Sequence, residues 1–154
     1  MSGLTRQSLR LFLFAALLSL AASPLFAQDM ICAKPKERLA PGAKINYDFS
    51  KMNYNMASGV VFDMMVSPGD YEGKTAKITG QFTSEIHEGK RIFAVIMWDA
   101  TGCCPTGLSV VPLEGKKYPA DFPAEKSTVT VTGVLESIEM FGGWSLCLVA
   151  ENWN

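Results

Sequence analysis

The chain has 154 residues, of which 48% are hydrophobic and 19% are charged, and its net charge at neutral pH is −1. A balance this close to neutral gives no basic surface for nucleic acid or for an anionic membrane. The length is sufficient for one hydrophobic core, and the four cysteines make the redox compartment the first question to settle.

The N-terminal segment has the composition of a secretory signal peptide. Two arginines precede the apolar run "LFLFAALLSLAA" at residues 11–22, and a small residue follows at Ala27. The run is short for a membrane span, and the residues before Cys32 do not match a lipidation site. We therefore expect residues 1–27 to be removed and the protein to be exported, to the periplasm or the medium, without spanning a membrane. Loss of a signal with two basic and no acidic residues changes the net charge from −1 to −3.

Residues 28–49 show no sustained periodicity and predict an extended leader that carries Cys32. The next stretch, "SKMNYNMASGVVFDMMVSPG" at 50–69, predicts a helix that begins near Ser50 and ends at Pro68. Methionines at this spacing are typical of core packing rather than of a copper(I) thioether site. The two apolar rows expected to face the core are Met52-Met56-Val60-Met64 and Ala57-Val61-Met65.

From residue 74 the hydrophobic pattern changes to a period of two. It predicts five strands, at 74–86, 91–99, 107–113, 127–140 and 144–153. Glycines inside the first and fourth of these, Gly80 and Gly133, are typical of the bends of a small barrel. We therefore predict an all-β fold for residues 50–154: a five-stranded, OB-fold-like β-barrel with one N-terminal α-helix across one mouth.

The cysteines form the candidate functional site. Cys103 and Cys104 come just before the third predicted strand and Cys147 lies near the start of the fifth. These two strands are parallel neighbours in an OB-type barrel, so we expect Cys147 close to the pair. Outside the cytosol, such thiols form disulfides or bind metal. A disulfide between Cys147 and one of the pair, a zinc or copper(I) site, and a redox-sensitive thiol site all remain open. Asp99 is a further candidate ligand, although it also fits a turn.

Catalytic patterns are sparse. His87 is the only histidine, and it is expected in the turn at the far end of the second strand from Cys103. A second histidine, a G-x-S-x-G nucleophile, a phosphate loop and an HExxH pair are all missing from the sequence. These features favour a binding protein over an enzyme.

Four stretches carry a family resemblance: "FDMMVSPGDYEGKTAKITGQF", "FAVIMWDATGCCPTGLSVV", "YPADFP…VTVTGVLES" and "CLVAEN". They resemble small exported bacterial proteins of unknown function with an OB-like domain. The "CCPTGL" stretch, within a D-A-T-x-C-C pattern, is also similar to the C-terminal domain of a permease-associated family, in which a double cysteine likewise precedes a strand. The resemblance implies an OB-like domain in the cell envelope and marks Cys103, Cys104 and Cys147 as the positions of interest, without implying an activity.

Together these patterns predict an exported, non-catalytic binding module. Its cysteine cluster would bind a transition metal, zinc or copper, or act as a redox-sensitive thiol site. The alternative is a disulfide-stapled structural or interaction domain without metal. In either case the expected partner is an envelope protein or a metal ion, not nucleic acid.

Overall fold

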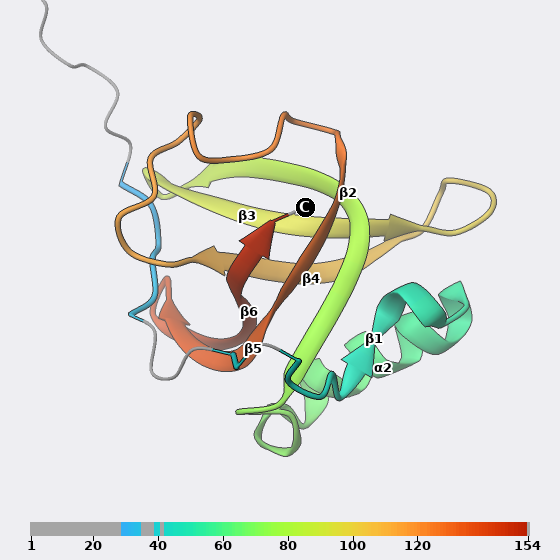
Figure 1. Cartoon of the computed structure of the whole chain (residues 1–154). Coiled ribbons are helices and arrows are strands. Elements are labelled where there is room, and N and C mark those ends of the chain that lie inside the picture. Colours follow the sequence, from blue (N-terminus) through green and yellow to red (C-terminus); the bar gives the residue numbers. More distant parts are fainter. Residues whose placement is uncertain (1–28, 35–38, 41, 154) are drawn as a thin grey trace, which may run out of the picture.

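The computed structural model describes residues 29–34, 39–40 and 42–153, and the expected signal peptide lies outside these ranges. Their fold is mostly β, with an α-helix ahead of the long strands (Figure 1). The strands are β1 (Tyr47–Asp48), β2 (Thr75–His87), β3 (Lys90–Trp98), β4 (Pro105–Pro112), β5 (Thr128–Met140) and β6 (Gly143–Trp153). The α-helix is α2 (Tyr54–Val66), flanked by the 3₁₀ turns η1 (Phe49–Lys51) and η2 (Pro68–Asp70).

The six strands form one mixed sheet in the order β1-β2-β3-β4-β6-β5. Because β5 also pairs with β2, from Thr75↔Val134 to Gln81↔Thr128, strands β2 to β6 close into a ring. The pairs β1–β2 and β4–β6 are parallel, and the other neighbours are antiparallel. The parallel contact expected between the third and fifth long strands is therefore confirmed.

The five predicted strands correspond to β2–β6, and each observed end lies within two residues of its prediction. The alternating pattern has the expected physical basis, because one face of each strand is covered. Side chains from that face form the main core, among them Ile78, Val95, Val110, Leu135 and Leu148.

Two glycines allow the strands to approach each other closely. A Cβ atom on Gly133 would lie 1.9 Å from the carbonyl oxygen of Val149, and the β5–β6 register shifts at this point. A Cβ atom on Gly80 would lie 2.5 Å from the carbonyl oxygen of Ile96. The sequence predicts bends at Gly80 and Gly133, and the structure shows close approach of the neighbouring backbones at both positions.

The leader pairs with the sheet more than its sequence indicated. Met30 forms a parallel bridge with Arg91, Ala33 forms one with Leu113, and β1 pairs with β2. Single bridges and a two-residue strand are too short to produce a detectable period of two. Sequence analysis therefore missed β1.

Helix α2 begins later than predicted. The side chain of Asn53, not Ser50, caps it and accepts a hydrogen bond from the backbone N–H of Met56 at 2.9 Å. Ser50 lies in η1 instead. The helix packs against one end of the ring, where it contacts β4 and β6 (Figure 1). In the part of the chain that the structure describes, no helix is long and apolar enough to cross a membrane.

The methionine stripe of α2 is only partly buried. Ala57, Val61 and Met64 face the core, whereas Met56 is 59% exposed and Met65 is 69% exposed. The buried positions follow an i, i+4, i+7 pattern that runs between the two expected rows, so Met56 and Met65 lie on opposite flanks of the helix. The prediction that Met56 and Met65 belong to the core is wrong.

Candidate functional site

The loop between β3 and β4 is organised by one carboxylate. Asp99 Oδ1 accepts hydrogen bonds from the backbone N–H groups of Cys103 at 3.0 Å and Cys104 at 3.4 Å. Asp99 Oδ2 accepts a hydrogen bond from the hydroxyl of Thr101 at 2.7 Å. Gly102 turns the chain with a φ of +70°, and its N–H donates to the carbonyl of Asp99. The predicted turn role of Asp99 is therefore confirmed.

The same loop brings two sulfur atoms and a carboxylate oxygen together. Cys103 Sγ lies 3.2 Å from Cys104 Sγ and 3.7 Å from Asp99 Oδ2. One ligand atom from each of these three residues lies within 4.8 Å of the others. Both cysteine side chains are exposed, so an ion or an oxidant could reach them from solvent. We call Asp99, Cys103 and Cys104 the thiol site.

The two thiols have different electrostatic environments. The nearby hydroxyl of Thr101, with Cys104 as a further hydrogen-bond partner, lowers the pKa of Cys103. The pKa of Cys104 is raised by its interaction with Cys103, by desolvation and by the charge of Asp99. The pKa of Asp99 is lowered, chiefly by its hydrogen bond with Thr101. Cys103 is therefore the more acidic thiol of the pair.

Helix α2 touches this loop through its first residue. The hydroxyl of Tyr54 donates a hydrogen bond to the backbone carbonyl of Cys104 at 2.6 Å. The pKa of Tyr54 is raised by desolvation and by the neighbouring groups Cys104 and Asp99. Sequence analysis did not identify Tyr54, because fifty positions separate the two contacting residues and no local pattern links them.

Cys147 is not brought to the pair. It is fully buried beside Ala33, Val111 and Val149, and burial raises the pKa of its thiol to about 12. The β4–β6 ladder begins at Val110↔Leu148. Cys147 therefore lies level with Ser109, which is five positions after Cys104. At about 3.3 Å per residue, that offset is roughly 16 Å along the strand.

The two other residues considered from sequence also lie apart from the thiol site. Cys32 is half-buried in the leader, and its pKa is raised by burial and by Glu114. His87 is exposed at the end of β2, where its ring meets that of Phe141 edge-on at 4.5 Å. The register of β3 places His87 opposite Lys90, at the other end of β3 from the thiol site, as predicted.

No protein-family model matches the chain, and no curated protein matches it. The function must therefore be inferred from the geometry of the site.

Proposed function

We propose that the protein is an exported, non-catalytic binding module that holds a soft transition-metal ion, zinc or copper(I), at Asp99, Cys103 and Cys104. The observation that carries this proposal is the placement of two thiol sulfurs and a carboxylate oxygen within 4.8 Å of one another on an exposed loop. Thiolates are the ligands that these two ions prefer, and zinc also accepts carboxylate oxygen.

The hydrogen bonds of the loop support a ligand set that is already positioned. Asp99 Oδ1 is used by the backbone of the loop, whereas Oδ2 faces the thiol of Cys103 and accepts one hydrogen bond, from Thr101, which leaves it a second lone pair. One oxygen can therefore keep the loop folded while the other binds the ion. Because metal and proton compete for a thiolate, the lowered pKa of Cys103 also favours binding at neutral pH.

Three ligands leave at least one position of a tetrahedral zinc ion open. The thiol site is exposed, so a partner protein could supply the missing ligand and take the ion over. We propose that this exchange takes place in the cell envelope, in line with the resemblance to permease-associated domains. We also propose that the ring of strands is an OB-like barrel, supported by the closure of β2 on β5 and the parallel β4–β6 pairing.

Metal titration of the reduced protein tests this function. Competition with a chromophoric chelator should show one zinc or copper(I) ion per chain. Cys103→Ser, Cys104→Ser and Asp99→Asn should each weaken binding by about tenfold or more, since loss of even an outer-shell partner commonly costs that much. Cys32→Ser and Cys147→Ala are matched controls that should leave the affinity unchanged. Binding that survives replacement of both exposed cysteines would refute the proposal.

The thiol site supports a second candidate, a redox-sensitive dithiol. The sulfurs of Cys103 and Cys104 lie 3.2 Å apart, and only Cys103 has a lowered pKa. A disulfide-bearing oxidant would accept two electrons from the pair, and the two thiols would lose their protons as the sulfur–sulfur bond forms. Treatment of the metal-free protein with oxidised glutathione should then remove two hydrogen masses. The single variants should instead retain a glutathione adduct, and a wild type that stays reduced would exclude this role.

A disulfide-stapled domain without metal is the alternative that sequence analysis left open. It needs Cys147 within bonding reach of Cys103 or Cys104. Cys147 is buried among apolar side chains, whereas Cys103 and Cys104 are exposed. We therefore prefer the metal proposal.

A further inference from the structure

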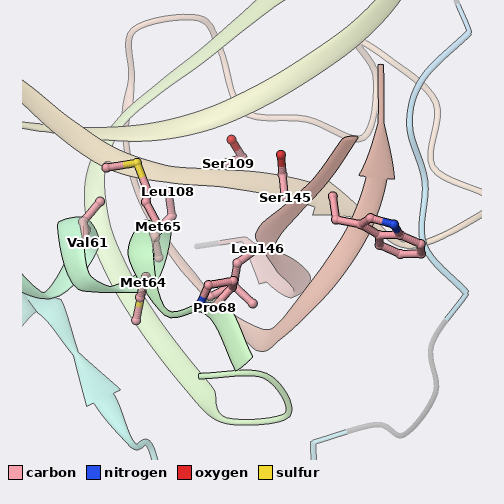
Figure 2. Close-up of a pocket in the computed structure, with 10 residues that line it drawn as sticks. Val61, Met64, Met65, Pro68, Leu108, Ser109, Ser145 and Leu146 are labelled. Carbon is pink, nitrogen blue, oxygen red and sulfur yellow. The ribbon is translucent and has the colours of Figure 1, made fainter. Parts of the chain in front are cut away.

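A cavity of about 280 Å³ opens between α2, β4 and β6 (Figure 2). Side chains of the helix line one side and those of the two strands line the other. The lining residues are Val61, Met64, Met65 and Pro68 from the helix region, Gly107–Ser109 from β4 and Trp144–Leu146 from β6. It shares no residue with the thiol site, and we call it the α2 groove.

The α2 groove lies where two strand edges separate. The β4–β6 ladder covers only Val110–Pro112 and Leu148–Ala150. The residues before it, 105–109 in β4 and 143–147 in β6, pair only with the outer neighbours β3 and β5. In such antiparallel pairs, alternate residues direct their N–H and C=O groups away from the partner. Here those groups are directed towards the space between β4 and β6.

Large apolar side chains surround the opening. Met65 is 69% exposed and Trp144 is 73% exposed, and both line the cavity. Phe62 is also exposed and neighbours Met65 on the helix surface, because it lies three positions before it. Exposed apolar groups gathered around a cavity mark a binding surface.

The segments that form the α2 groove carry only acidic charges. Residues 52–73, 99–113 and 139–150 contain no lysine or arginine. Their charged residues are Asp63, Asp70, Glu72, Asp99 and Glu139. Of these, Asp99 belongs to the thiol site, and Asp63 lies on the Met56 side of α2, where it accepts a hydrogen bond from the hydroxyl of Tyr71. Glu139 is the cross-strand partner of Trp144, so its carboxylate lies beside the groove. Glu139 is therefore the charged group that the register places at the groove, and it complements a ligand with a basic flank.

We propose that the α2 groove binds an extended peptide segment of a partner protein, with alternating apolar side chains and flanking lysine or arginine. The extended backbone of a peptide can form hydrogen bonds with the edges of β4 and β6 that face the groove. An apolar small molecule would leave the N–H and C=O groups of these edges without partners. Every second side chain would enter the cavity against Met64 and Leu108, while a basic flank would meet the carboxylate of Glu139. This site is separate from the proposed metal site and does not depend on it.

Selection from a displayed library of random peptides about nine residues long tests this inference. We expect the wild-type protein to enrich peptides in which apolar residues alternate and at least one flank is basic. The double variant Met65→Ser/Trp144→Ser should bind the enriched peptide at least about tenfold more weakly. Both side chains are exposed, so the variant should keep its fold. Met56→Ser is the matched control: it is also exposed, but nine residues, or about two and a half turns, place it on the opposite side of α2.

Two further peptides separate backbone pairing from simple hydrophobic binding. Methylation of alternate backbone nitrogens should abolish binding, and replacement of the basic flanks by glutamate should weaken it about tenfold or more. Amide chemical shifts should change at Gly107–Ser109 and Trp144–Leu146. Failure to enrich any peptide, or equal binding by the Met65/Trp144 double variant, would overturn the proposal. So would displacement of the peptide by an uncharged long-chain alcohol, or a concentration-dependent dimer that occupies the groove.

Discussion

The exposure of the α2 methionines leads to a sharp prediction about stability. Met64 is 2% exposed and Met56 is 59% exposed, although they lie on the same helix and share one side-chain chemistry. Replacing Met64 by alanine removes about three carbon-sized groups from the core, or roughly 2.4 kcal/mol at about 0.8 kcal/mol per group. A residual void of roughly 50 Å³ would add about 1.2 kcal/mol. We therefore expect Met64→Ala to lower the free energy of unfolding by about 3–4 kcal/mol.

Met56→Ala should change the same free energy by less than about 0.5 kcal/mol, because surface substitutions of this type cost little. Urea unfolding followed by tryptophan fluorescence measures both values, and an unchanged m value would show that the transition remains comparable. Equal losses for the two variants would contradict the observed orientation of α2. A loss below about 1 kcal/mol for Met64→Ala would show that this side chain does not pack in the core.

Three further outcomes follow from the described geometry. Gly133→Ala should reduce expression of folded protein, because the new Cβ would lie 1.9 Å from a carbonyl oxygen. A Cβ at Gly59 would meet no atom within 4 Å, so Gly59→Ala should stabilise the helix by about 0.5–1 kcal/mol, measured by thermal unfolding. Iodoacetamide labelling followed by peptide mass mapping should show Cys103 reacting at a lower pH than Cys104, and the reverse order would contradict their pKa directions. Burial raises the pKa of the Cys147 thiol to about 12 in the folded state, from an ordinary value of 9.0 in the unfolded chain. The contribution of this thiol to stability is therefore complete below pH 9 and decreases as the pH rises towards 12. Cys147→Ala should flatten this alkaline decline in urea unfolding, and an identical slope in both proteins would refute the assignment.

The strands were predictable because their pattern has a local cause. Burial alternates along β2, β3 and β5, and this alternation can be read directly from the sequence, whereas consecutive residues are buried at Val110–Pro112 of β4 and Cys147–Ala150 of β6. The turn at Asp99 was predictable for a similar reason, since an aspartate side chain favours hydrogen bonds to the backbone a few residues further on. Both features depend on residues close together in the chain.

The features that sequence analysis missed depend on register and on distant contacts. Knowing that β4 and β6 are parallel did not reveal that their ladder starts at Val110↔Leu148, and this offset separates Cys147 from the pair. The rotation of α2 was equally hidden, because apolar residues surround much of the helix and only packing decides which of them are buried. The contact between Tyr54 and Cys104 joins segments that have no pattern in common.

The most direct measurement of the central claim is the intact mass of the protein purified from its native host, recorded under native and then denaturing conditions. We predict one zinc or copper ion per chain in the native spectrum and four free thiols after denaturation. The double variant Cys103→Ser/Cys104→Ser should be metal-free, while Cys147→Ala should retain the ion. A wild-type protein that carries no metal, or a double variant that still carries one, would contradict the account.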